Sequence, residues 1–248
     1  MINEISCGEA IWGQGLYLRK RLLFNAFAEI AAKSHRVFAA ADFSVIGLLN
    51  SNKTLWIMAE EGADCFDGIC EIMREHDVRG FVAEPDFGEI LAERTGFVHD
   101  ETSLAFAAEQ PLLPAPKTDG FMRPARQSDT AAITKILAAY YAEIHNLEIT
   151  PDLPDCDFFV WNNKEIAAIG ASSCSQRGIA RINYVYTLPG HRRRGYAAAL
   201  ISALCANARS SNQIPALYVN SKNQPAAALY RALGFLPQGM LHIYNKRV

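Results

Sequence analysis

Three consecutive arginines and a glycine, in the stretch His-Arg-Arg-Arg-Gly-Tyr-Ala at residues 191–197, separate a predicted strand (181–187) from a predicted helix (197–208). Backbone N–H groups at a helix N-terminus lack intrahelical partners, and the helix dipole favours an anion there. Gly195 lets the backbone approach a ligand closely. A solvated basic loop is the simpler interpretation, but the flanking strand and helix favour a phosphate-binding loop.

Composition sets broad limits on the chain. Its 248 residues suggest one large domain or two of ordinary size, and half of them are apolar. The net charge of −2 argues against a general nucleic-acid binder. No apolar run reaches the roughly 18–20 residues needed to span a membrane. The first residues lack a basic region followed by an apolar core. We therefore expect a cytoplasmic protein with no membrane partner.

The cysteines include no Cys-x-x-Cys pair, and no second ligand pair at metal-site spacing accompanies Cys65 and Cys70. Disulfides and a zinc site are the alternative roles for these cysteines. Reduced, buried thiols fit a cytoplasmic protein better, so we expect no metal site. The six cysteines are Cys7, Cys65, Cys70, Cys156, Cys174 and Cys205.

The first half of the chain alternates between strand and helix signals. Apolar residues at helical spacing predict that most of residues 1–35 is helical. The further predicted elements are a strand or strand pair at 36–49, strands at 54–58, 80–83 and 103–108, and helices at 63–76 and 87–95, the last ended by Gly96.

A segment with three prolines and a glycine, residues 110–120, separates the two halves. Proline at this density disfavours both helix and central strand. We therefore predict an N-terminal α/β domain at residues 1–112, a linker at 113–120, and a second domain at 121–248.

The second half reads as a mixed α/β fold. Its predicted order is β-α-β-β-β-α-β-α-β. The predicted strands are 121–126, 158–161, 165–174, 181–187, 216–219 and 241–244, with helices at 130–144, 197–208 and 225–233 and a turn at 175–178.

This order, with the arginine loop, resembles the GCN5-related N-acetyltransferase (GNAT) superfamily. Arg192, Gly195 and Ala197 match the defining positions of the family's acetyl-CoA loop, Arg/Gln-x-x-Gly-x-Gly/Ala. Residues 217–235, with Asn220, Asn223 and a closing Gly-Phe, resemble the family's last strand, helix and turn. The resemblance covers about residues 121–248 and implies an acyltransferase that uses acetyl-CoA.

The first half lacks the arginine loop, but residues 79–97 echo the strand, helix and Gly-Phe ending of the second half. This echo suggests a degenerate copy of the same fold, as in family members with tandem domains. Glycine N-acyltransferases have a comparable two-part layout. An unrelated α/β cap is an equally open interpretation.

The resemblance assigns a donor site residue by residue. The backbone of Val185, Tyr186 and Thr187 would bind the pantetheine arm and polarise the acyl carbonyl. The pyrophosphate would lie on N–H groups between Arg193 and Ala198, with the arginines nearby. The implied cofactor-binding residues are Val185, Tyr186, Thr187, Arg192, Arg193, Arg194, Gly195, Tyr196, Ala197, Ala198, Asn220 and Asn223.

Tyr230 matches the tyrosine of the family's penultimate helix and is the implied general acid for the departing thiolate. A core tyrosine is the alternative. Asn223 is also a candidate N-cap for the following helix. Residues 179–187 contain no acid, so the general base stays open among Glu143, His145, Glu148, ordered water and an acceptor that arrives neutral.

The aromatic residues Tyr140, Tyr141, Phe158, Phe159 and Trp161 are candidates for an acceptor pocket or for the core. The leading hypothesis is an N-acetyltransferase acting on a primary amine, most simply a small molecule. A non-enzymatic acyl-CoA sensor is the second, and a basic-loop nucleic-acid binder is a third that the acidic balance disfavours. The acceptor cannot be read from the sequence, and a homodimer is compatible with it.

Overall fold

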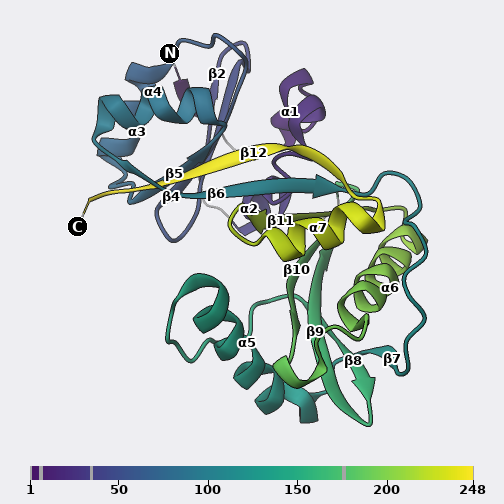
Figure 1. Ribbon diagram of the computed structural model, residues 1–248. Helices are drawn as coiled ribbons and strands as arrows, with labels where there is room; N and C mark the ends of the chain where they lie inside the picture. The colour runs from purple at the N-terminus through teal and green to yellow at the C-terminus, as the bar shows by residue number, and fades with distance from the viewer. Residues whose placement is uncertain (1, 6–7, 34–35, 175–176, 248) are drawn as a thin grey trace. The chain divides into compact units, whose positions relative to one another are not determined.

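The computed structural model describes residues 2–5, 8–33, 36–174 and 177–247 (Figure 1). The chain divides into two compact units. The N-terminal unit comprises residues 1–106, 218–222 and 237–248, and the C-terminal unit comprises residues 107–217 and 223–236. Strands β11 (Ile214–Asn220) and β12 (Leu236–Asn245) therefore contribute residues to both units.

In the N-terminal unit the strand order is β1-β2-β3-β4-β5-β12-β6. Neighbours from β1 to β4 pair antiparallel, β4 and β5 pair parallel, and β5 and β12 pair antiparallel. The strands are β1 Ile2–Ile5, β2 Arg36–Ala40, β3 Val45–Leu49, β4 Thr54–Ala59, β5 Gly80–Ala83 and β6 Val98–Ala107, and the helices are η1 Gly8–Ile11, α1 Gly15–Lys20, α2 Phe27–Lys33, α3 Phe66–Glu75 and α4 Pro85–Thr95.

The period-two alternation of the strands separates two cores in this unit. On β4, Leu55 and Ile57 join a cluster with Phe66 and Ile69 of α3, whereas Met58 joins a second cluster with Phe27 of α2. Helices therefore cover both faces of the strands, and this explains why β3 is buried along its whole length.

The structure bears out most elements predicted for this half and corrects one. The predicted strand at 80–83 is β5, and α4 ends at Gly96, which adopts the left-handed conformation (φ 74°). Within the predicted helical range of 1–35, the described residues 2–5 and 8–33 are less helical than predicted. Residues 2–5 form β1 because they pair with Val37 to Ala40 of β2, a partner more than thirty residues away along the chain.

In the C-terminal unit the strand order is β11-β10-β9-β8-β7. All neighbours pair antiparallel except β10 and β11, which pair parallel. The elements follow the predicted order and are β7 Phe121–Pro124, η2 Gln127–Asp129, α5 Thr130–His145, β8 Asp157–Asn163, β9 Glu165–Cys174, β10 Ile179–Thr187, η3 Pro189–His191, α6 Tyr196–Ser210, β11, α7 Gln224–Leu233 and β12. The predicted mixed α/β fold is confirmed.

Helices α5 and α6 contribute to the core of this unit in different ways. Ile133 and Leu137 of α5 cluster with Val160 of β8 and Ile169 of β9. Leu200 of α6 comes close to Gly170, where an added Cβ would lie 3.3 Å from the Leu200 Cδ2. A glycine on β9 thus permits close packing of the helix that carries the arginine loop.

The proline-rich segment belongs to the C-terminal unit and packs against it. The Leu113 N–H donates a hydrogen bond of 2.9 Å to the carbonyl of Leu233, at the end of α7. Arg209 of α6 donates to the carbonyl of Ala108 at 2.5 Å. The boundaries predicted from composition (1–112, 113–120 and 121–248) divide the chain differently from the compact units, and they stay a prediction.

Free thiols are found at several cysteines of the described residues. Cys205 is buried, and Cys65, Cys70 and Cys156 are half-buried. Cys7 and the first half of the predicted turn at 175–178 lie outside the described residues. Across the described part of the chain, no helix is both long enough and apolar enough to cross a membrane.

Candidate functional site

The arginine loop leads from β10 into α6 through the short helix η3. Gly195 is the N-cap of α6 and has φ 82°, and Arg193 is also left-handed at φ 62°. Intrahelical bonding begins with the Ala199 N–H, which donates to the Gly195 carbonyl at 3.0 Å. The N–H groups of Tyr196, Ala197 and Ala198 therefore lie at the start of a 15-residue helix, where an anion is favoured.

The three arginines of the loop divide into two kinds. Arg193 and Arg194 are exposed and carry the loop's positive charge into solvent. Arg192 instead turns back to the protein: its Nε donates to the Thr187 carbonyl at 3.0 Å, and its Nη2 lies 2.7 Å from the Glu143 Oε2 of α5. The sequence motif predicts a phosphate contact for all three arginines, whereas in the structure Arg192 bonds to Thr187 and Glu143.

The proline-rich segment touches the loop, a contact that sequence reasoning missed. Thr118 Oγ1 donates to the Arg194 carbonyl at 3.0 Å. A Cβ built on Gly195 would lie 3.6 Å from the Cβ of Pro116, which is ordinary van der Waals contact. Positive φ, rather than lack of space, is thus what Gly195 supplies at this position.

A second anchor holds the first residue of α6. Asn163 donates to the buried Tyr196 hydroxyl at 2.6 Å, and that hydroxyl donates to Asp119 Oδ1 at 3.4 Å. Asp119 also accepts from Trp161 through its backbone carbonyl at 3.0 Å. His191 lies 3.1 Å from Glu165. Tyr196 therefore fixes the helix start by its side chain, in addition to the backbone role expected of it.

β10 contains a β-bulge just before the loop. Asn183 pairs with Ala171 and Tyr186 pairs with Ile169, so Tyr184 and Val185 together face one residue of β9. Tyr184 has φ 54°, in the left-handed region. The parallel pairing with β11 covers Ile179 to Arg181, although β10 continues to Thr187. The end of β10 is therefore irregular at Val185 to Thr187, the residues whose backbone is predicted to bind the pantetheine arm of acetyl-CoA.

The three predicted contact residues of β10 differ in environment. Val185 is half-buried, and Tyr186 is buried with its hydroxyl donating to Glu143 Oε2 at 2.7 Å. Burial and the bond to Glu143 raise the pKa of Tyr186. Within the described residues, the buried hydroxyl of Thr187 has no hydrogen-bond partner. A buried hydroxyl without a partner is energetically costly, so a ligand that bonds to it would be favoured.

Tyr230 lies on α7 and is buried, with its ring centroid 5.7 Å from that of Phe235. Burial raises the pKa of Tyr230, which keeps the phenol protonated at neutral pH. Asn223 is the N-cap of α7, and its side chain accepts from the Ala226 N–H at 3.2 Å. Asn220 belongs to the N-terminal unit, where its side chain accepts from the Lys222 N–H at 2.8 Å.

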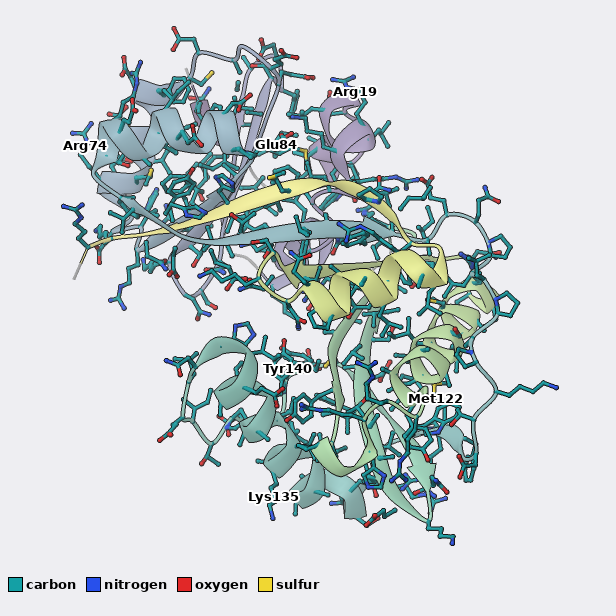
Figure 2. The ribbon with its side chains drawn as sticks, viewed as in Figure 1. Arg19, Arg74, Glu84, Met122, Lys135 and Tyr140 are labelled. Carbon is teal, nitrogen blue, oxygen red and sulfur yellow. The ribbon has the colours of Figure 1, made fainter. Side chains whose placement is uncertain are left out.

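Aromatic side chains gather between α5 and β10. Tyr140 of α5, which Figure 2 labels, meets Tyr184 and Tyr186 edge to face, with ring centroids 5.9 and 6.2 Å apart. Phe158 stacks on Tyr184 at 5.9 Å. Phe159 and Trp161 alternate with Phe158 on β8 and are buried elsewhere. The predicted aromatic group therefore divides between the two faces of β8.

The candidates for the general base lie in different environments. Glu143 is half-exposed, and its bonds to Arg192 and Tyr186 lower the pKa of its carboxyl. His145 Nε2 lies 3.3 Å from the Tyr140 hydroxyl, which places the imidazole beside the aromatic group. Glu148 is exposed in the segment after α5. A lowered pKa makes Glu143 a weak base while Arg192 stays beside it.

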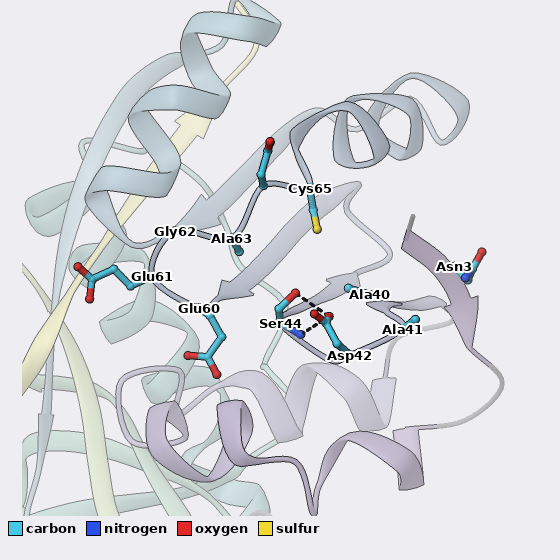
Figure 3. A pocket seen from close by; sticks show the side chains of 11 residues that line it. Asn3, Ala40, Ala41, Asp42, Ser44, Glu60, Glu61, Gly62, Ala63 and Cys65 are labelled. Carbon is cyan, nitrogen blue, oxygen red and sulfur yellow. Dashed lines mark hydrogen bonds between the residues drawn. The ribbon is translucent and has the colours of Figure 1, made fainter.

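The N-terminal unit contains a hollow of its own, of about 690 Å³ (Figure 3). Acidic residues contribute much of its lining, including Asp42, Glu60 and Glu61. Asp42 accepts from the Ser44 hydroxyl at 2.7 Å and from the Ser44 N–H at 3.0 Å, so this carboxylate is already bonded within the protein.

The sequence profile of the Acetyltransferase (GNAT) family matches residues 130–235. That segment runs from the start of α5 to the Gly-Phe after α7 and includes the arginine loop, so this part of the chain is a GNAT acetyltransferase domain. Acyl transfer is the general chemistry of the family. No curated protein matches the chain.

Several solved structures share the fold across both units. A GCN5-related N-acetyltransferase from Kribbella flavida has a TM-score of 0.66 at 17% identity, covering 91% of this chain and 95% of that one. Another, from Sphaerobacter thermophilus, has a TM-score of 0.62 at 14% identity, covering 99% and 95%. A tandem GNAT protein from the clavulanic acid biosynthesis pathway has a TM-score of 0.59 at 10% identity, covering 98% and 97%. Similarity to a tandem protein over the full length agrees with a GNAT-like N-terminal half.

Proposed function

We propose that this chain is an N-acetyltransferase that moves an acetyl group from acetyl-CoA to a primary amine. The observation that carries the proposal is the left-handed Gly195 at the start of α6. Arg193 and Arg194 are exposed beside it. All three residues lie inside the segment that matches the GNAT profile. The backbone N–H groups at the helix start, the helix dipole and the positive charge of the arginines all favour the binding of an anion there. The pyrophosphate of acetyl-CoA is the anion proposed.

The remaining contacts with acetyl-CoA are proposed on β10, at the end of β11 and at the start of α7. The backbone of Val185, Tyr186 and Thr187 is proposed to hold the pantetheine arm, and the Thr187 hydroxyl is a further donor or acceptor for it. Asn220 and Asn223 are proposed contacts of the same arm. The bulge at Tyr184 and Val185 supports this arrangement because it interrupts the regular pairing of β10.

In the proposed reaction a neutral amine attacks the thioester carbonyl, so that the N–C bond forms as the C–S bond breaks. The amine then loses a proton to solvent water, the departing thiolate gains a proton from Tyr230, and the Tyr230 phenolate takes a proton back from solvent water. Burial raises the pKa of the Tyr230 phenol, so it holds its proton at neutral pH and is a weaker acid than an exposed tyrosine. Proton donation therefore depends on the thiolate developing directly beside the hydroxyl. The proposal places the enzyme in the cytoplasm, where the thiols of Cys65, Cys70 and Cys205 stay reduced.

Calorimetric titration with acetyl-CoA tests the proposal. Binding is expected for the unmodified protein, and Gly195→Glu should abolish it by adding strain and negative charge to the loop. Gly178→Glu is the matched control, because Gly178 has φ 78° and open space around it. The control should bind as the unmodified protein does. No binding at millimolar acetyl-CoA would contradict the proposal.

A second candidate function is a non-enzymatic acyl-CoA sensor. It is favoured by the lack of any acid on β10, whose described residues are 179–187, and by the lowered pKa of Glu143. Free-thiol release from acetyl-CoA, measured across amino acids, polyamines, aryl amines and peptide N-termini, separates the two. An enzyme releases thiol with at least one class, whereas a sensor binds acetyl-CoA without release.

A further inference from the structure

The Arg192 guanidinium occupies a small site built for a cation. Its Nη2 lies 2.7 Å from Glu143 Oε2, and its Cζ lies 5.3 Å from the centroid of the Tyr186 ring. The Tyr186 hydroxyl donates to the same Glu143 oxygen at 2.7 Å and so holds the carboxylate in place. A carboxylate beside an aromatic face is a general recognition device for an ammonium or guanidinium group.

The helix beneath this site adds to its preference for cations. Glu143 lies in the last turn of α5, which ends at Asn146 in the left-handed conformation. The negative end of the helix dipole favours positive charge there. The segment around Glu143 also favours a bound cation, because residues 136–163 contain no lysine or arginine. The acids of that segment are Glu143, Glu148, Asp152, Asp155 and Asp157.

The ion pair between Arg192 and Glu143 is weak enough for Arg192 to leave Glu143 and bind another anion. Their side chains are 38% and 44% exposed, and an ion pair of that exposure contributes little to stability because water screens it. A phosphate group, by contrast, can accept two hydrogen bonds from one guanidinium. Arg192 also belongs to the loop proposed to bind pyrophosphate. One side chain thus has two competing anionic partners.

We propose that Glu143 and the Tyr186 ring form the site that receives the cationic group of the amine acceptor, and that Arg192 fills this site until a donor phosphate draws it away. The inference rests on the proposed function and names its substrate class: an amine that enters as a cation and loses one proton to solvent water before its neutral form attacks the thioester. It also makes Glu143 a positioning residue, since it holds the acceptor's charge and does not bond to the acyl group.

The arrangement has a thermodynamic consequence. Because the donor removes Arg192 from Glu143, donor and cation bind with positive coupling, and that coupling is the same whichever binds first. Removing the Glu143 charge frees Arg192 without the donor. Donor affinity should then rise by about two- to fivefold, which is the range set by the strength of an exposed ion pair.

The first measurement is calorimetric titration of CoA into Glu143→Gln. Tighter binding than in the unmodified protein is expected. Glu71→Gln, at an exposed position of α3, is the control for loss of one negative charge and should leave CoA affinity unchanged. If Glu143 merely anchors the loop, Glu143→Gln will weaken CoA binding, and that result or an unchanged affinity would overturn the inference. An unmodified protein that does not bind CoA would instead refute the proposed function.

The second measurement titrates benzylammonium, a cationic probe, with benzyl alcohol as its neutral counterpart. Benzylammonium should bind several-fold more tightly to the protein saturated with CoA than to the free protein. Glu143→Gln should remove this difference, and Glu143→Asp should restore part of it. Equal binding with and without CoA, or equal binding of the alcohol and the ammonium ion, would count against the inference.

Discussion

Thr118 Oγ1 donates a hydrogen bond of 3.0 Å to the backbone carbonyl of Arg194, and this contact ties the proline-rich segment to the arginine loop. Arg194 directly precedes the left-handed Gly195 that begins α6. The orientation of the Arg194–Gly195 peptide therefore depends in part on a side chain that lies 76 residues earlier in the chain. A segment expected to be only a linker thereby becomes a support of the candidate site.

Replacing Thr118 by valine should weaken donor binding more than it weakens the fold. Valine keeps the shape of threonine but removes the hydroxyl donor, so the Arg194 carbonyl loses one partner. A typical hydrogen bond contributes about 1 kcal/mol, so acetyl-CoA affinity should fall by about three- to tenfold in calorimetric titration. Thr95→Val removes a hydroxyl that bonds within α4 and serves as the control. Equal affinity in both variants would refute the supporting role.

Replacing Tyr230 by phenylalanine should lower turnover and leave acetyl-CoA affinity nearly unchanged. The ring still packs against Phe235, but the proton for the departing thiolate is lost. General acid catalysis of this kind contributes roughly 10²–10⁴-fold, so kcat should fall by about that factor. The control variant Tyr244→Phe removes a buried phenol that lies in the N-terminal unit and outside the proposed site, so it should leave kcat nearly unchanged. A kcat for Tyr230→Phe equal to that of the unmodified protein would exclude Tyr230 as the acid.

Local sequence patterns predicted much of this fold. The strand at 80–83, the helix end at Gly96 and the element order of the second half depend on apolar periodicity and on glycine, which act within a few residues. The loop between β10 and α6 was predictable for the same reason, since Gly195 and the arginines are neighbours in the sequence; its binding of phosphate stays a prediction.

Contacts between distant residues were not predictable in this way. β1 exists because residues 2–5 pair with β2, and nothing in its own four residues demands a strand. The bonds from Thr118 to Arg194 and from Glu143 to Arg192 join segments 76 and 49 residues apart. Arg192 illustrates the difference: its position in the motif suggested a phosphate ligand, but its partner in the free protein depends on where α5 packs.

Replacing Asp129 by asparagine should destabilise the fold at neutral pH by about 2 kcal/mol. Asp129 receives two bonds from Arg123, at 2.6 and 3.1 Å, and one from the Arg126 N–H at 2.7 Å. These partners, Arg123 foremost, lower the pKa of Asp129 to about 2. The exposed Asp152→Asn is the control and should change stability little.

The pH dependence of this effect has a definite sign. The unfolded pKa of aspartate is about 3.9, so the folded state binds this proton less readily than the unfolded state does. The stabilisation by Asp129 is therefore complete above about pH 4 and is lost as the pH falls towards 2. Urea unfolding at several pH values should show the unmodified protein and Asp129→Asn converging in acid. A constant difference down to pH 2 would contradict the assignment.

Replacing Gly88 by alanine should destabilise the N-terminal unit, although alanine is the better helix former. Gly88 lies within α4, where the exchange alone would stabilise by about 1 kcal/mol. An added Cβ, however, would lie 2.7 Å from Cε2 of Tyr244, which is closer than real contacts allow. Tyr244 is buried and stacks on Phe81 with centroids 4.5 Å apart, so the ring has little freedom to move. Overpacking of this kind costs about 1–3 kcal/mol.

Gly68→Ala provides a matched control on α3 of the same unit. A Cβ there would meet Ile2 at 3.5 Å, an ordinary contact, so only the helix preference should act. Thermal unfolding should therefore shift in opposite directions, with Gly68→Ala raising the melting temperature and Gly88→Ala lowering it. If both variants are stabilised, the close approach of α4 to Tyr244 of β12 is wrong. If both are destabilised, strain in α3 outweighs propensity, and the contrast between the two glycines fails.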